Sequence, residues 1–231
     1  NLNFDISKLK KFTSEDEIYE NISSSSLEID LLVLATPSGL HASQTIRAAK
    51  HKLNICTEKP MATNWEDGLA MCKASKKAGV LLFVVKQNRF NPTLQLLKKQ
   101  LDKDRFGKIA LVNVNVFWHR PQSYYDQAKW RGTWEFDGGA LMNQASHYVD
   151  LLHWLIGPVE HLSASTATLA REIEAEDTAS MQLKWKNGAL GTMAVTMLTY
   201  PKNLEGSITI LGEKGTVVLG GTAVNEIKPT V

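Results

Sequence analysis

The strongest candidates for chemistry in this 231-residue chain are three polar residues at helical spacing, Asn143, His147 and Asp150. They occupy positions i, i+4 and i+7 of an apolar segment, so a helix would place all three on one face. An imidazole near a carboxylate and an amide can act as a general base, because the carboxylate fixes its tautomer. The alternative is a half-buried structural histidine whose hydrogen bonds are satisfied.

A second candidate is Lys59, which lies in the tripeptide Glu58-Lys59-Pro60 after a short apolar run. If that run is a parallel strand, the tripeptide lies at its carboxyl end, where open α/β sheets bind ligands. A lysine there can hydrogen-bond a substrate hydroxyl, and burial can lower its pKa enough for acid–base catalysis. The alternative is a solvated lysine in a turn.

Polar residues also follow the neighbouring apolar runs. Thr36-Pro37 and His41 come after the preceding run, and a turn carrying a hydroxyl suits a planar ring such as nicotinamide. The alternative is an ordinary strand-to-helix turn that Ser38 caps. Residues 87–89, which end in Arg89, are suitably polar at the end of the third run, and their alternative is an interdomain hinge.

The segment 119–136 is long, irregular and rich in aromatic and charged residues. Loops of this length are unusual in compact domains unless they bind something. Trp130 and Arg131 could stack a flat ring and hold an anion, while Tyr124 and Arg120 suit a phosphate-bearing ligand. The alternative is an aromatic loop packed on the sheet or on another subunit.

Composition excludes several classes of protein. Hydrophobic residues make up 43% and charged residues 22%, as in folded globular chains, and the net charge of +2 is too small for an electrostatic nucleic-acid binder. No apolar run approaches the roughly 20 residues of a membrane span, and no secretory signal opens the chain. Cys56 and Cys72 cannot alone form a disulfide framework or a four-ligand zinc site, and the histidines lack ligand spacing. We therefore predict a cytoplasmic protein without a metal, a membrane or a nucleic-acid partner.

The first part of the chain alternates predicted strands and helices. Apolar runs at 29–35, 53–57 and 80–85 read as buried strands, and amphipathic stretches at 38–49 and 64–78 read as the helices between them. Strands that alternate with helices in this way form a parallel sheet with right-handed crossovers.

After Phe90 the pattern changes. Asn91 and Pro92 begin a predicted helix, residues 108–118 alternate as a strand, and Gly138-Gly139 opens an apolar helix that runs to about residue 156. Extended runs separated by glycine-containing turns then continue to the end and predict a mostly antiparallel sheet.

We therefore predict an α/β fold, with a partial Rossmann-type parallel sheet followed by an α+β domain that has a mostly antiparallel sheet. Residues 1–90 would be the C-terminal part of a dinucleotide-binding domain, and residues 91–231 a domain for substrate binding and oligomerisation. The chain starts at Asn1 and contains neither a glycine-rich phosphate-binding loop nor an acidic ribose-binding residue, so we expect a piece of a longer protein. The partly exposed antiparallel sheet predicts a homo-oligomer.

Three motifs in this order resemble the Gfo/Idh/MocA family of nicotinamide-dependent sugar oxidoreductases. They are LVLATPSGLH at 32–41, EKP at 58–60 and DGGALMNQASHYVDLL at 137–152, a form of the family's G-G-x-x-x-D-x-x-x-H-x-x-D helix. The resemblance covers nearly the whole chain. Longer stretches, among them KQNRFNPTLQLLK and IEAEDT, are similar to a branch that serves bacterial surface-polysaccharide synthesis, the UDP-N-acetyl-glucosaminuronate 3-dehydrogenases (WbpB/WlbA type).

The resemblance implies that NAD takes a hydride from C3 of a UDP-linked sugar acid and leaves a 3-keto sugar. Lys59 would bond the reacting hydroxyl, and His147 would be the general acid/base. Asn143 stands where many family members have Asp, so it is assigned hydrogen bonding. NAD rather than NADP rests on the branch resemblance alone, and the family suggests a tetramer.

The resemblance also implies which residues line the ligands. The cofactor side would comprise Thr36, Pro37, Ser38, His41, Glu58, Lys59, Trp130 and Arg131. The sugar or its phosphates would meet Arg89, Tyr124, Asn143 and His147. Two other functions stay open: a dehydrogenase of free sugars or inositols with the same fold, and a non-catalytic protein that binds a nucleotide or partner subunit as a regulator.

Overall fold

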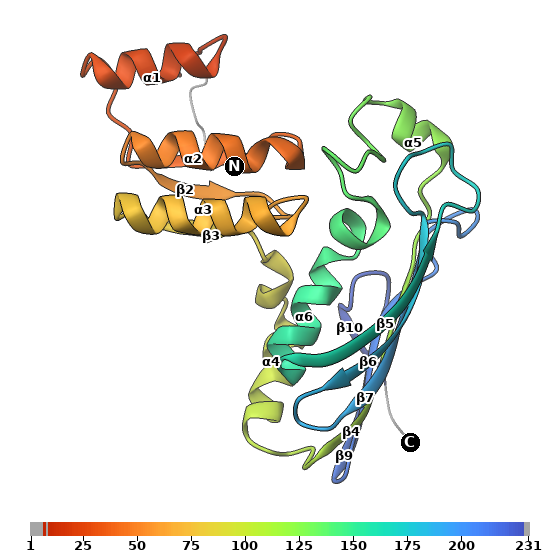
Figure 1. The fold of residues 1–231 in the computed structure, drawn as a ribbon. Helices are drawn as coiled ribbons and strands as arrows, with labels where there is room; N and C mark the ends of the chain where they lie inside the picture. Colours follow the sequence, from red (N-terminus) through yellow and green to blue (C-terminus); the bar gives the residue numbers. More distant parts are fainter. Residues whose placement is uncertain (1–6, 8, 229–231) are drawn as a thin grey trace.

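A computed structural model describes residues 7 and 9–228. It contains a three-stranded parallel sheet and a mostly antiparallel seven-stranded sheet, which lie in two separate bodies of the molecule (Figure 1). The predicted fold class is confirmed. The division into domains at residues 90 and 91 stays a prediction, and the short 3₁₀ turn η3 (Gln87–Phe90) occupies this connection.

The smaller sheet has the order β1-β2-β3, with all strands parallel. The predicted strands and connecting helices are confirmed, as β1 (Leu31–Leu34), β2 (Asn54–Thr57), β3 (Leu82–Val84), α2 (His41–Lys50) and α3 (Trp65–Ala78). Asn64 begins α3 because its side chain accepts a hydrogen bond from the Asp67 amide at 2.8 Å. Ser38 does not cap as predicted: it starts the 3₁₀ turn η2 (Ser38–Leu40), and α2 follows at His41 without a side-chain cap.

One face of the smaller sheet is packed and the other is exposed. Leu34 and Ile55 are buried with Ala48 and Ala49 of α2, and α3 packs on the same core. Side chains alternate along a strand, so the neighbouring residues point to the opposite face. There Leu31, Val33 and Phe83 are 45%, 60% and 51% exposed. The outlying helix α1 (Glu15–Ser23) contacts α2 through Tyr19, whose ring stacks on His51.

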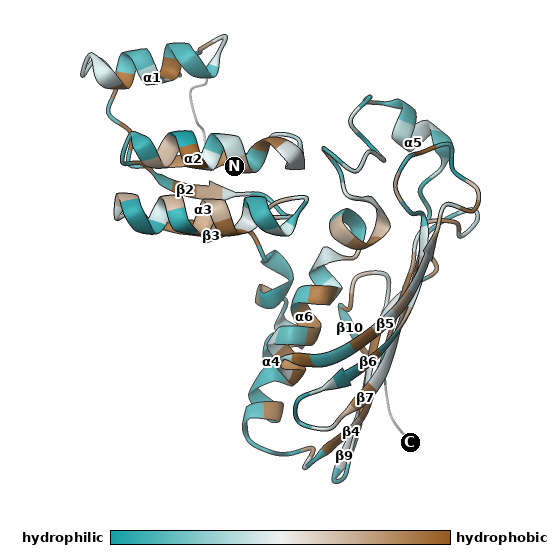
Figure 2. Cartoon of the chain, viewed as in Figure 1, coloured by the Kyte–Doolittle hydropathy of each residue, from teal (hydrophilic) through white to brown (hydrophobic). Residues whose placement is uncertain are grey.

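The larger sheet has the order β10-β9-β8-β4-β7-β6-β5 and is antiparallel except where β4 pairs with β7. Its strands are β4 (Ile109–Phe117), β5 (Val159–Ala167), β6 (Thr178–Trp185), β7 (Leu190–Thr196), β8 (Glu205–Gly212), β9 (Gly215–Gly220) and β10 (Glu226–Lys228). Helices α4 (Pro92–Asp102) and α6 (Ser146–Ile156) cover one face, and none of the helices that the structure describes covers the other (Figure 1). Figure 2 shows apolar positions on α6, where Leu151, Leu152 and Leu155 join the core of this sheet.

The predicted helix from residue 139 to 156 is interrupted. Ala140–Gln144 form a single π-helical turn, η4, before α6 begins at Ser146. Glu176, two residues before β6, caps the start of this turn: its backbone oxygen accepts the Ala140 amide and its carboxylate accepts the Leu141 amide, and neither amide has a partner within a helix. The break leaves the Asn143 carbonyl oxygen free to accept side-chain donors, and such π turns are frequent at functional sites.

Candidate active site

Two loops at the carboxyl ends of β1 and β2 are tied together by His41. Its Nδ1 lies 2.9 Å from the Pro60 carbonyl oxygen and its Nε2 lies 3.1 Å from that of Thr36. The ring is fully buried, so it holds the two loops in register beneath the surface instead of facing a ligand there. The side chain of Thr36 is exposed above it and donates to Gln44.

Lys59 crosses from the smaller sheet to the turn η4. Its ammonium donates to the Asn143 side-chain oxygen at 2.7 Å and to the Asn143 carbonyl oxygen at 3.1 Å. An ammonium has three N–H groups, so one remains without a partner among the residues that the structure describes. Burial lowers the pKa of Lys59, and the positive charges of Lys86 and Arg120 lower it further, while Glu58 and Asp137 oppose them. The arrangement leaves Lys59 one donor for a substrate hydroxyl.

His147 lies one turn beyond Asn143 and is 9% exposed. Its Nε2 is 3.3 Å from the amide nitrogen of Gln87, which can donate to it. Burial lowers the pKa of His147 to about 4, and the charges of Lys59 and Lys86 add to this effect. The imidazole is therefore neutral near pH 7, which is the form that accepts a proton.

Asp150 does not fix the tautomer of His147 as the sequence predicts. Its two carboxylate oxygens accept from Arg89 Nε at 2.7 Å and Nη2 at 2.6 Å. A bidentate pair of this kind is stronger and more directional than a bond to a neutral imidazole. Gln87 takes the place next to His147, and Arg89 is held where the smaller sheet meets α6.

The three predicted helix residues do share a face, and each meets a partner from the loop after β2 or from the connection η3. Asn143 contacts Lys59, His147 contacts Gln87, and Asp150 contacts Arg89. The lysine and the imidazole, which come from distant parts of the sequence, therefore converge in one site.

The segment before η4, which the sequence predicts to be irregular but which contains the short helix α5 (Gln122–Asp126), forms the other side of this site. Arg120 Nε donates to the Gln144 side chain at 3.0 Å, and Gln144 donates to the Tyr124 hydroxyl at 3.0 Å. The Arg131 guanidinium lies 4.1 Å from the centre of the Tyr124 ring and 5.5 Å from that of Trp130. Its Nε and Nη1 are buried and have no partner in the described part of the chain. Stacked donors of this kind suit an anion or the carbonyl oxygen of a flat ring.

These residues fit part of a nicotinamide dinucleotide. Hydroxyl, ammonium and guanidinium donors come from residues 36–38, Lys59 and Arg131, and the unpaired Arg131 nitrogens call for an acceptor such as a carboxamide or a phosphate. Glu58 lies in the same loop and accepts the Lys59 amide at 3.2 Å.

Two residues of this site, Lys86 and Asp137, are not predicted from the sequence. Lys86 directly follows the β3 region, so the strand-end rule that singles out Lys59 could have found it too. Asp137 is 2% exposed and accepts a hydrogen bond from the Asn143 side chain. Its position directly before Gly138-Gly139 carries no periodic signal.

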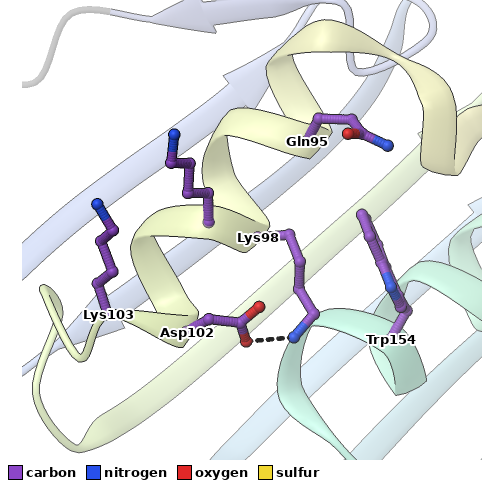
Figure 3. A pocket seen from close by; sticks show the side chains of 6 residues that line it. Gln95, Lys98, Asp102, Lys103 and Trp154 are labelled. Atoms are coloured by element: carbon purple, nitrogen blue, oxygen red, sulfur yellow. Dashed lines mark hydrogen bonds and ion pairs between the residues drawn. The ribbon is translucent and has the colours of Figure 1, made fainter.

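Other candidate sites are weaker. A surface hollow of about 330 Å³ lies between α4 and Trp154, where Lys98 pairs with Asp102 and the other lysines extend outward (Figure 3). Among residues 7 and 9–228, no cluster of three metal-ligating side chains occurs. No described helix has the length and hydropathy of a membrane span.

Known proteins match the chain over both sheets. Residues 3–86 match the oxidoreductase family with an NAD-binding Rossmann fold, and residues 94–218 match the GFO/IDH/MocA C-terminal domain. The WlbA dehydrogenase from Bordetella pertussis, solved in complex with NADH and UDP-GlcNAcA, is 63% identical, has a TM-score of 0.89, and covers 92% of this chain and 64% of its own. The corresponding complex from Chromobacterium violaceum is 65% identical with a TM-score of 0.89, over 92% of this chain and 61% of its own.

A curated relative, an uncharacterized oxidoreductase from Synechocystis, is 29% identical over 84% of this chain and 55% of its own length. The chain thus spans less than two thirds of the length of each of these relatives. With both characteristic domains matched, the chain belongs to the Gfo/Idh/MocA oxidoreductase family.

Proposed function

We propose that the protein containing this chain oxidises the C3 hydroxyl of a UDP-linked N-acetyl-glucosaminuronic acid to a 3-keto sugar, with NAD as oxidant, in bacterial surface-polysaccharide synthesis. The observation that carries the proposal is the identity of 63% and 65% to two dehydrogenases whose structures hold NADH and UDP-GlcNAcA. The convergence of Lys59 and His147 supports it, because alcohol oxidation needs both an oxygen-binding donor and a base.

NAD, when bound, supplies the acceptor for the hydride on the substrate carbon. The free N–H of Lys59 binds the hydroxyl oxygen and stabilises the negative charge that grows there as the proton leaves. The neutral His147 accepts that proton, so the products are a ketone and a reduced cofactor, with the proton held on the imidazole. Asn143 holds the ammonium in place through its two oxygens.

The remaining site residues are proposed to bind the two ligands. Thr36, Pro37, Ser38 and Glu58 would lie along the nicotinamide side, above the brace that His41 provides. Arg131 would meet the cofactor with its Nε and Nη1, which lack partners among the described residues, and the Trp130 ring would lie beside it. Tyr124 and Arg89 would bind the sugar or its diphosphate, and the Arg89 side chain is 37% exposed beside its bond to Asp150.

The test uses the full-length protein and follows NADH absorbance with UDP-N-acetyl-glucosaminuronate and NAD⁺. We expect turnover with this pair and slower turnover with NADP⁺. A signal from myo-inositol but none from the UDP sugar would transfer the proposal to free polyols. No signal from any sugar would favour a non-catalytic, nucleotide-binding regulator.

We propose further that the protein is a tetramer formed through the uncovered face of the larger sheet. Leu111 of β4 and Leu190 of β7 pair on this face and are 41% and 54% exposed. Lys184 lies directly beside Leu190 and pairs with Glu160, and the positions Asn113, Thr192 and Gln182 next to them are polar without charge. Light scattering on the full-length protein should give four times the mass of one full-length subunit, and a monomeric mass would contradict the proposal.

We place the protein in the cytoplasm because its two cysteines, Cys56 and Cys72, are free thiols.

A further inference from the structure

Asp137 is a buried carboxylate whose two oxygens are both engaged. One oxygen accepts a hydrogen bond from the Asn143 side-chain amide, and the other accepts the Gly132 backbone amide at 2.7 Å. Burial raises its pKa, while the Gly132 and Asn143 hydrogen bonds and the charges of Lys59 and Arg131 oppose this shift. Asp137, Asn143 and Lys59 therefore form a continuous chain of hydrogen bonds that ends at the reactive ammonium.

The chemistry of the two end groups fixes the orientation of the amide between them. An ionised carboxylate only accepts hydrogen bonds, and an ammonium only donates them. Asn143 satisfies both when its nitrogen faces Asp137 and its oxygen faces Lys59, as in the structure. The reverse orientation would place two donors together at Lys59 and two acceptors together at Asp137.

We propose that Asp137 is a positioning residue that, through the amide of Asn143, holds the Lys59 ammonium with its third N–H directed to the substrate hydroxyl. This inference rests on the dehydrogenase activity proposed above and names a residue on which its catalytic step depends. Asp137 needs no contact with substrate or cofactor for this role. Its effect should appear in turnover and in the titration of Lys59, not in substrate affinity.

Three variants of the full-length protein test the orientation argument. In Asp137→Asn the oxygen of the new amide must accept from the Gly132 amide, so its nitrogen faces Asn143 as a donor. The Asn143 amide then has to turn its oxygen to this donor, which places its own nitrogen against the Lys59 ammonium. In Asn143→Asp two carboxylates meet. In the double variant Asp137→Asn/Asn143→Asp every donor again meets an acceptor, because the new amide donates to the new carboxylate, which accepts from Lys59.

We expect each single variant to lower kcat by about 10- to 100-fold with KM nearly unchanged, as for a lost hydrogen bond to a charged group. The double variant should recover kcat to within a few-fold of the wild type. Asp126→Asn is the matched control, because Asp126 is an exposed carboxylate at the end of the short helix α5 (Gln122–Asp126) and accepts a hydrogen bond from the Gln122 side chain. This control should leave kcat unchanged.

The titration of Lys59 gives a second readout that needs no substrate. The negative charge of Asp137 raises the pKa of Lys59, so Asp137→Asn should lower it and the double variant should restore it. NMR of ¹³Cε-labelled lysine, assigned with Lys59→Met, measures this shift. If the wild type does not oxidise the UDP sugar, the proposed function fails while this titration still tests the positioning role.

Wild-type kcat and an unshifted Lys59 titration in Asp137→Asn would overturn the proposal. A double variant no more active than the two singles would do so as well. Thermal melting of all variants separates misfolding from catalysis: an unstable Asp137→Asn beside a stable, active double variant supports the matched-donor argument. If Asp137→Asn and the double variant are both unstable, the proposal is contradicted, because the matched donor and acceptor of the double variant should allow it to fold.

Discussion

The chain Lys59–Asn143–Asp137 and the Arg131 side of the active site differ in how completely their polar groups are paired. His147, whose buried Nδ1 has no partner among the described residues, belongs to neither. On one side Lys59, Asn143 and Asp137 form a chain of hydrogen bonds. Among the described residues, two of the three N–H groups of the Lys59 ammonium have partners in it. On the other side Arg131 stacks on Tyr124 with two buried nitrogens unpaired among the described residues. A fully paired group is held in its working geometry before substrate arrives, whereas unpaired donors are satisfied only when a ligand brings acceptors. The paired side is thus built for chemistry and the unpaired side for binding.

The largest expected effect comes from the paired side. Replacing Lys59 with Met removes the donor to the hydroxyl oxygen, so we expect kcat to fall by about 10³-fold or more while the fold is retained. Steady-state NADH formation measures the loss, and circular dichroism checks the fold. Lys99→Met, on the exposed side of α4, is the control. If the Lys59→Met variant kept near-native turnover, Lys59 would not be a catalytic residue.

His147→Asn should lower kcat by about 10²- to 10⁴-fold, because the variant lacks the base. The wild type provides a sharper test through pH. The pKa of His147 is lowered to about 4, so the imidazole stays neutral and active between pH 4 and its ordinary value near 6.5. Plots of kcat/KM against pH should therefore keep their activity across this window. An acid limb near 6.5 that belongs to this histidine would contradict the burial argument.

On the unpaired side we expect an effect on affinity. Arg131→Lys keeps the charge but loses the planar fork of donors, so KM for a ligand should rise by about 10- to 100-fold with kcat within a few-fold. Separate titrations of KM for cofactor and sugar identify which ligand Arg131 holds. Arg105→Lys, on an exposed turn, serves as control. If Arg131→Lys changed kcat alone, Arg131 would act in catalysis, and the assignment of its side of the site to ligand binding would be wrong.

The smallest effect should come from Lys86→Gln. Lys86 lowers the pKa of His147 through its charge, so its removal should raise that pKa from about 4 toward the ordinary value. Activity at pH 7 then changes little, and the acid limb of kcat/KM moves to higher pH. A limb that stays in place would show that Lys86 lies too far away to act on the imidazole, and a limb that moves to lower pH would contradict the direction of its effect.

The sequence by itself determined the local elements and the main candidates. Apolar runs between breakers predicted the parallel strands, Asn64 and Asn91 marked helix starts, and the helical spacing placed Asn143, His147 and Asp150 on one face. These features depend on neighbours a few residues apart, which is the range over which periodicity and capping act. The same reasoning left the role of Lys59 open, because a lysine after a strand has no partner that spacing can reveal.

Only the tertiary structure decided which groups meet. The Asn143 amide and Lys59 are 84 positions apart, and Asp150 pairs with Arg89 across 61 positions, so their partners follow from how the two sheets are packed. A π-helical turn at Ala140–Gln144 interrupts the helix before His147, and Glu176 of a distant segment caps that turn, which helical periodicity does not predict. The role of Asp137 is also decided by the tertiary structure, because its burial and its hydrogen bonds to Gly132 and Asn143 cannot be predicted from residue type or spacing.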